Sequence, residues 1–241
     1  MLIAIINHKH TSNAIKLKVH FEKHSDVICI DSGSELNQEE KKHFKISLGN
    51  VYYCGMINAI GEHLKKNITK YKFVYIIASD VEISEHEKLV VKAKKAFDNS
   101  AIGVYGPSVN KNGSPHPQMI NKNTNRYRKA VFIDGYCFAV RTDLLLNLCP
   151  IDTSINFIGW GIDVYLSYLA IKKGLLTVVD DQMVVQHRPS ENQEFRSDAR
   201  NQRNDWFKQL GKKARLYRQI TSIELLKNEL GASMINHLNW K

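Results

Sequence analysis

Two carboxylates one residue apart follow a strongly apolar stretch of the sequence. The stretch is 73–78 (FVYIIA), and Ser79, Asp80 and Glu82 come just after it. Such a run is typical of a strand buried on both faces, and ligands of open α/β sheets bind beyond the carboxyl ends of the strands. Alternate residues of an extended chain point the same way, so Asp80 and Glu82 could share one hard cation such as Mg²⁺ or Mn²⁺. The alternative is a helix start with Ser84 as its N-cap.

A second acid, Asp31, also follows an apolar run and heads the turn 31–34 (DSGS). At the end of a strand it could accept a hydrogen bond from a ribose hydroxyl or from a base N–H. It could equally stabilise the turn without any ligand, and the two roles do not exclude each other.

A third acid lies in the segment 159–166 (GWGIDVYL), where two glycines enclose Trp160 and Asp163 follows. The pattern predicts a tight entry to a helix that runs to Lys173, with Gly174 in the C-cap position. The positive end of this helix helps to keep Asp163 ionised and attracts phosphate. Trp160 could form a stacking floor for a sugar or a base, or it could serve packing alone.

Strands and helices alternate along the chain, which predicts an α/β fold with a mostly parallel sheet flanked by helices. Apolar runs predict strands at 2–6, 27–30, 73–78, 101–105, 130–133 and 134–140, and two β segments in 175–185 that break at 180–181. The spacing and type of residues predict helices from residue 12, over 51–64 and 89–97, from 143 to Pro150, and after the glycines at 159 and 161 as far as Lys173. The loop 106–125 is long enough to suggest that it binds a ligand.

The net charge of +10 is concentrated in two segments. Segment 111–129 holds five basic residues and no acid, and segment 187–218 holds nine basic and four acidic residues. This surplus suits phosphate on a nucleotide, a nucleic acid or an anionic membrane surface, and a solvated face is the alternative. Because no window approaches the roughly 18 apolar residues of a membrane-spanning helix, we expect a cytoplasmic protein. The spacing of the four cysteines indicates buried free thiols.

Four of these features, in this order, resemble the glycosyltransferases of the GT-A fold, family 2 type. They are 30–34 (IDSGS), 79–82 (SDVE), 133–135 (IDG), and 159–166 followed by His187. The resemblance spans about residues 2–190. It implies a GT-A-like catalytic domain over 1–190 and leaves a basic helical C-terminal extension, 191–241, packed on that domain.

The resemblance implies a nucleotide-sugar donor bound over the carboxyl edge of the sheet. Asp31 would contact the nucleoside, Asp80 would be the metal-ligating acid, and His187 would be a late metal or diphosphate ligand. Carboxylates and an imidazole suit Mn²⁺ or Mg²⁺. The expected donor-binding residues are Asp31, Ser79, Asp80 and Trp160, and the expected metal ligands are Asp80, Glu82 and His187.

Asp163 matches the catalytic base of the family, and Asp134 is the rival base, an acceptor-binding acid or a simple turn residue. An inverting transfer needs such a carboxylate to take the proton of the acceptor hydroxyl. The sequence departs from the family at two places: Ile162 stands where a second acid is common, and Ser79 stands where the metal motif has Asp or Asn. An inactive relative is therefore a second possibility.

The leading hypothesis is a metal-dependent glycosyltransferase, and the alternative is a non-catalytic nucleic-acid-binding module with structural acids. Two acceptors remain open. One is DNA with a hydroxylated base, as in viral genome modification, with the basic segments on its phosphates. The other is a cell-surface glycan on a lipid carrier, with the basic tail in peripheral contact with anionic headgroups.

Overall fold

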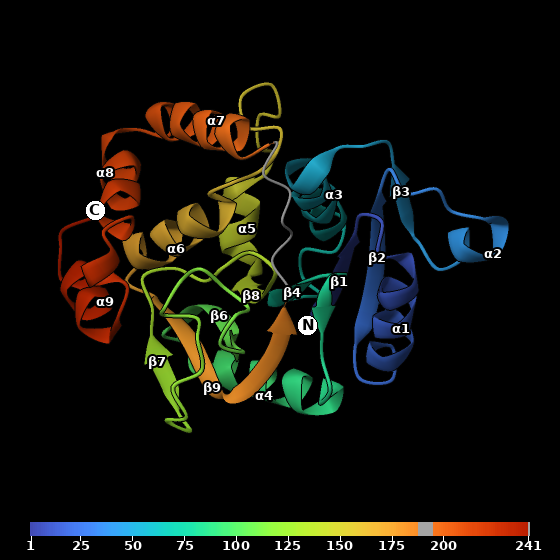
Figure 1. Cartoon of the computed structure of the whole chain (residues 1–241), viewed down its shortest axis with the longest axis horizontal. Coiled ribbons are helices and arrows are strands. Elements are labelled where there is room, and N and C mark those ends of the chain that lie inside the picture. The colour runs from blue at the N-terminus through green and yellow to red at the C-terminus, as the bar shows by residue number, and fades with distance from the viewer. Residues whose placement is uncertain (188–194, 241) are drawn as a thin grey trace.

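The computed structural model describes residues 1–187 and 195–240 and shows a central sheet with helices on its faces (Figure 1). The strand order is β3-β2-β1-β4-β8-β6-β9-β5, and β7 pairs with β9. The strands are β1 (Leu2–Asn7), β2 (Asp26–Ser32), β3 (Ile46–Leu48), β4 (Phe73–Ala78), β5 (Val81–Glu82), β6 (Ile102–Val109), β7 (Tyr127–Lys129), β8 (Cys137–Arg141) and β9 (Leu176–His187). The helices are α1 (Thr11–Phe21), α2 (Gln38–Lys41), α3 (Tyr52–Lys65), α4 (His86–Asp98), α5 (Thr142–Leu148), α6 (Ile162–Lys172), α7 (Arg196–Gln209), α8 (Lys212–Thr221), the 3₁₀ turn η1 (Glu224–Leu226) and α9 (Glu229–Asn236).

The predicted α/β architecture is confirmed, and the sheet combines parallel and antiparallel strands. Strands β3, β2, β1 and β4 are parallel, whereas β8 runs antiparallel between β4 and β6. All six residues of β1 and five of β4 are buried, because helices cover both faces of these apolar strands. Parallel strands end at one edge, so the polar residues at the ends of β1 and β2 and just after β4 come together there.

Three predictions about strands were wrong, because in each case hydrogen bonds with residues distant in sequence decide the local structure. Strand β6 continues through Gly106 to Val109, since β9 offers it a parallel partner. Segment 130–133 is not a strand: the side chain of Gln118 accepts from the Val131 N–H and donates to the Phe132 carbonyl in place of a neighbouring strand. Strand β9 is continuous, although its register with β6 jumps between residues 180 and 184.

The C-terminal helices lie beside α6 and β7, at the left of Figure 1. Aromatic rings carry this contact: Tyr165 of α6 packs against Trp206 of α7, and Tyr168 packs against Tyr217 of α8 and against Trp240. The predicted division into 1–190 and 191–241 remains a proposal, because its boundary lies outside the described residues.

The four cysteines are buried and free, as predicted. In the described part of the chain, no helix is long and apolar enough to cross a membrane.

Candidate functional site

Asn7 joins the polar residues at the carboxyl edge of the parallel strands. Its Nδ2 donates to Oδ1 of Asp31 at 2.7 Å, and its Oδ1 accepts from Oγ of Ser79 at 2.8 Å. The Asn7–Asp31 hydrogen bond joins β1 to β2, because these two residues lie opposite each other in the register of the two strands. Asn7 is fully buried, so these bonds hold the ends of β1, β2 and β4 together.

Asp31 supports the turn that follows β2. Its second oxygen, Oδ2, accepts from the backbone N–H of Ser34 at 2.9 Å, and the side chain is buried. The structure therefore shows the turn role, and contact with a nucleoside stays a prediction. Ser79 is likewise buried and bonded to Asn7, which makes it a support of the edge; its place in donor binding also stays a prediction.

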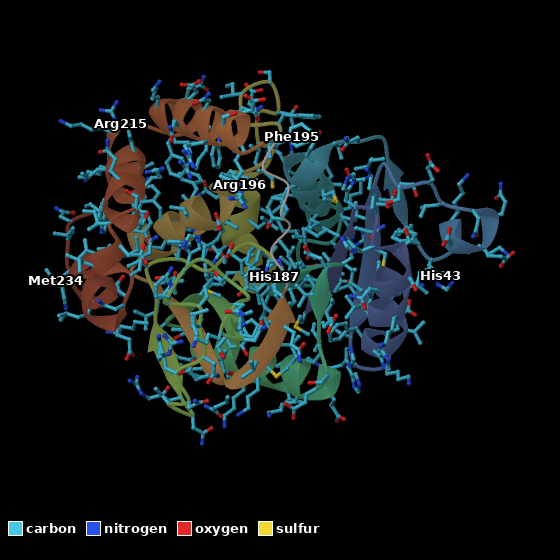
Figure 2. The ribbon with its side chains drawn as sticks, in the orientation of Figure 1. His43, His187, Phe195, Arg196, Arg215 and Met234 are labelled. Carbon is cyan, nitrogen blue, oxygen red and sulfur yellow. The ribbon has the colours of Figure 1, made fainter. Side chains whose placement is uncertain are left out.

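A cleft of about 880 Å³ opens at this edge, between the ends of β1 and β2 and the start of α7. Trp160, 38% exposed, lines it with Tyr52 and Phe195, and Figure 2 shows Phe195 and Arg196 at the start of α7. Aromatic faces suit a base or a sugar ring. The lining residues are His8, Lys9, Thr11, Gly33, Ser34, Glu35, Asn50, Tyr52, Ile158, Trp160, Phe195, Arg196 and Ala199.

Asp80 and His187 are brought together although 107 positions separate them in sequence. Strand β5 pairs with β9 so that Val81 lies opposite His187, and Nε2 of His187 is 3.5 Å from Oδ2 of Asp80. The other ring nitrogen, Nδ1, lies 2.7 Å from the Gly113 carbonyl, to which it donates. The ring also stacks on Tyr136, with centroids 4.2 Å apart. These contacts direct Nε2 toward Asp80.

Asp80 has one oxygen that no neighbour satisfies. Its Oδ1 is buried without a hydrogen-bond partner among the described residues, which is costly unless a ligand supplies one. Burial alone would lower the pKa of His187, but the hydrogen bond with Asp80 and that with Gly113 outweigh it and leave the pKa above its ordinary value. An oxygen without a partner beside an oriented imidazole fits a divalent cation that takes its remaining ligands from phosphate and water.

Glu82 is not part of this pair. It is exposed and lies opposite Gln186 in the β5–β9 register, because Asp80 belongs to a turn and the expected extended geometry does not hold there. No group of three acids, histidines or cysteines within the described ranges could hold a metal ion. The structure thus unites two of the three predicted ligands.

Asp134 lies in the loop before β8 and Asp163 in the first turn of α6, close enough for their charges to interact. Ser114 Oγ and the Gly135 N–H donate to the two oxygens of Asp134, at 2.8 and 3.0 Å. The Val164 N–H donates to Oδ1 of Asp163 at 2.8 Å. Burial, and then repulsion by Asp134, raises the pKa of Asp163 to about 7. The backbone N–H groups at the start of the helix lower the pKa of Asp163, as expected, but burial and Asp134 outweigh them.

The two glycines before Asp163 have separate structural reasons. Both have positive φ, +92° at Gly159 and +87° at Gly161, which L side chains rarely adopt. A Cβ on Gly159 would lie 2.8 Å from the Cys54 backbone nitrogen, and a Cβ on Gly161 would lie 2.8 Å from Cγ of Arg203. The tight turn places Trp160 in the cleft and starts α6 at Ile162, with Asp163 in its first turn.

Sequence reasoning missed three residues of the site. Asn7 follows the predicted strand 2–6 and is the last residue of β1, a signal that could have been read as it was for Asp31. Tyr53 donates its hydroxyl to the Gly135 carbonyl at 3.0 Å and holds the Asp134 loop, but on sequence it is one aromatic residue of a helix. Arg203 influences Asp163 from α7, and nothing local indicates this contact.

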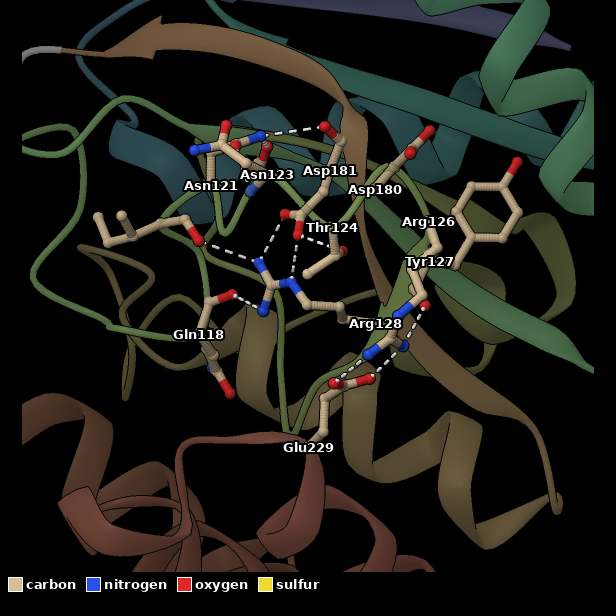
Figure 3. A network of polar contacts seen from close by, with 12 residues as sticks. Gln118, Asn121, Asn123, Thr124, Arg126, Tyr127, Arg128, Asp180, Asp181 and Glu229 are labelled. Atoms are coloured by element: carbon tan, nitrogen blue, oxygen red, sulfur yellow. Dashed lines mark hydrogen bonds and ion pairs between the residues drawn. The ribbon is translucent and has the colours of Figure 1, made fainter.

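Two of the five cations in the basic segment 111–129, which was predicted to suit phosphate or to form a solvated face, are paired with acids. Arg128 and Asp181 form a buried two-pronged ion pair, with N–O distances of 2.7 and 2.8 Å (Figure 3). Arg128 also donates to the Gln118 carbonyl at 3.0 Å. Arg126 makes a similar pair with Glu229 of α9, at 2.8 Å for both bonds. These two cations stabilise the loop and dock α9.

Comparisons with known proteins support the fold. No family model and no curated protein matches the sequence. A crystal structure of GalNAc-T7 with UDP, GalNAc and Mn²⁺ matches with a TM-score of 0.53 and 13% identity, over 77% of this chain and 43% of that chain. A mycobacterial protein matches with a TM-score of 0.52 and 15% identity, over 83% of this chain and 70% of that one. The chain has a GT-A-like fold. It spans less than half of the GalNAc-T7 chain, and identities this low establish the fold alone.

Proposed function

We propose that the protein is a glycosyltransferase that transfers a sugar from a nucleotide-sugar donor to an acceptor hydroxyl with the help of Mn²⁺ or Mg²⁺. The observation that carries the proposal is the Asp80–His187 pair, with its unsatisfied carboxylate oxygen, at the same edge as the aromatic cleft. The GT-A-like fold supports it, and the GalNAc-T7 structure was solved with UDP and Mn²⁺.

The donor would lie along the carboxyl edge of the sheet. Tyr52, Trp160 and Phe195 supply apolar faces for its base, and Arg196 supplies positive charge at the rim of the cleft. Asp80 and His187 would hold the cation, which neutralises charge on the diphosphate leaving group. Glu82 would act at most through water.

Asp163 would accept the proton of the attacking hydroxyl in an inverting transfer. A carboxylate with a pKa of about 7 binds the proton strongly enough to remove it and is still half ionised at neutral pH. Asp134 is less suited, because Ser114 and Gly135 already donate to both of its oxygens. Asp134 would then raise the basicity of Asp163 and help to position the acceptor.

Calorimetric titration with UDP, with and without Mn²⁺, tests the proposal. Wild type should bind UDP more tightly with the metal, and Asp80→Ala should remove this difference, because the carboxylate that anchors the cation is lost. Glu82→Ala is the matched control and should retain it. Metal dependence that survives in Asp80→Ala, or that both variants lose equally, would overturn the assignment of the ligands.

The acceptor is a further proposal, and both DNA with a hydroxylated base and a cell-surface glycan remain open. A nucleic-acid-binding module without catalysis would bind duplex DNA in a gel retardation assay and show no metal-dependent binding of UDP. The buried Arg128 removes part of the charge on which the DNA hypothesis depends.

A further inference from the structure

Three arginines of the C-terminal helices lie close enough together for two of them to destabilise the positive charge of the third. Arg200 and Arg203 are one turn apart on α7, and Arg218 is on α8. Burial, and then repulsion by Arg218 and Arg200, lowers the pKa of Arg203 to about 10. Burial and Arg200 also lower the pKa of Arg218. Guanidinium groups in proteins normally stay far from titration, so these side chains are crowded.

No acid in the described ranges forms an ion pair with this cluster, and Asp163 acts on Arg203 only from beyond 4.0 Å. The ion pairs that arginines make there, within 4.0 Å, involve Arg126, Arg128 and Arg141 instead. Nε of Arg203 is buried without a hydrogen-bond partner in that part of the chain, and its Nη2 makes only a long bond, 3.4 Å, to Asn204. Buried donors without partners and convergent like charges are both costly, and an anionic ligand would relieve both.

The cluster lies beside the proposed base. Cγ of Arg203 is 2.8 Å from where a Cβ on Gly161 would be, at the start of α6, and its charge acts on Asp163 without an ion pair within 4.0 Å. Asp163 also interacts with Asp134, which in turn acts on His187. The cluster therefore acts on Asp163, and neither residue of the proposed metal pair is among the described residues whose charges change the pKa of two of its arginines. Figure 2 shows His187 at the end of β9, away from α7.

We propose that Arg200, Arg203 and Arg218 bind a phosphate monoester carried by the acceptor, next to Asp163. This proposal rests on the proposed function and narrows its acceptor to a phosphate monoester, which counts against DNA because the internal phosphates of DNA are diesters. A phosphate monoester carries nearly two charges and three strong acceptor oxygens at neutral pH, which matches three forked cations. A carboxylate or a phosphodiester, with one charge each, would leave most of the cluster unneutralised.

Binding of inorganic phosphate to the full chain, followed by ³¹P NMR, tests the site with and without saturating UDP and Mg²⁺. Arg203→Gln and Arg200→Gln should weaken phosphate binding by about tenfold or more, because charge-assisted hydrogen bonds are lost. Arg215→Gln is the matched control, since it removes the same charge from an exposed position on α8. Wild type and this control should bind phosphate alike, whether or not UDP is present.

Equal phosphate affinity in Arg203→Gln, Arg200→Gln and Arg215→Gln would overturn the proposal. Competition between UDP and phosphate would also overturn it and would assign the arginines to the donor diphosphate. Dimethyl phosphate that binds as tightly as phosphate would refute the monoester assignment. Arg200 is exposed, so its variant decides the matter even if Arg203→Gln fails to fold. Absent UDP binding refutes the glycosyltransferase proposal separately, because phosphate binding is also measured without nucleotide.

Discussion

Replacing Asp163 by Asn should make the folded protein more stable, by an amount that depends on pH. The pKa of this carboxyl rises from an ordinary 3.8 to about 7 on folding. The folded protein therefore holds the proton more tightly than the unfolded chain, and ionisation of Asp163 destabilises the fold as pH rises from 3.8 to 7. One pKa unit corresponds to about 1.4 kcal/mol, so the full penalty is about 4 kcal/mol, reached above pH 7.

Asn has nearly the shape of the protonated acid and keeps an oxygen for the Val164 N–H, so the variant avoids this penalty. Urea unfolding should show a gain of about 2 kcal/mol at pH 5 that grows to about 4 kcal/mol at pH 8. Asp98→Asn, an exposed position on α4, is the control and should show no such trend. A gain for Asp163→Asn that is equal at pH 5 and pH 8 would refute the reasoning. Transfer by the same variant should fall by about 10²–10⁴ if Asp163 is the base.

Three other changes test separate parts of the structure. Asp134→Asn removes the repulsion that raises the pKa of Asp163, so the rise of the transfer rate with pH should move to lower pH. If the pH profile does not move, or if transfer is abolished while donor binding is intact, Asp134 would be the base. Arg128→Met should lower the free energy of unfolding by about 3–5 kcal/mol, because it leaves Asp181 buried and unpaired, whereas Arg126→Gln should barely change it in the same urea series. Trp160→Ala should weaken UDP binding by roughly three- to tenfold in calorimetry, and unchanged affinity would remove this ring from the donor site.

Much of the framework could be predicted because its signals are local. The predicted strand 73–78 coincides with β4, and the helices predicted at 51–64 and around 163–173 match α3 and α6 to within two residues. Continuous apolar runs, helical spacing and glycine stops depend on neighbours along the chain, so they can be read without knowing the fold. The same signals place Asp31, Asp80 and Asp163 at the ends of elements.

Only the tertiary structure decided how these residues act. The turn at Asp80 and the pairing of β5 with β9 place His187 beside Asp80 and leave Glu82 away from this pair. No local sequence pattern indicates the pairing of β5 with β9 or the contact between Asp80 and His187. Arg128 of the basic loop forms a buried ion pair because Asp181 of β9 lies against that loop. The identity and position of each charge follow from sequence alone, whereas its ionisation and its partners depend on burial and on charges far away in the chain, which only folding brings close.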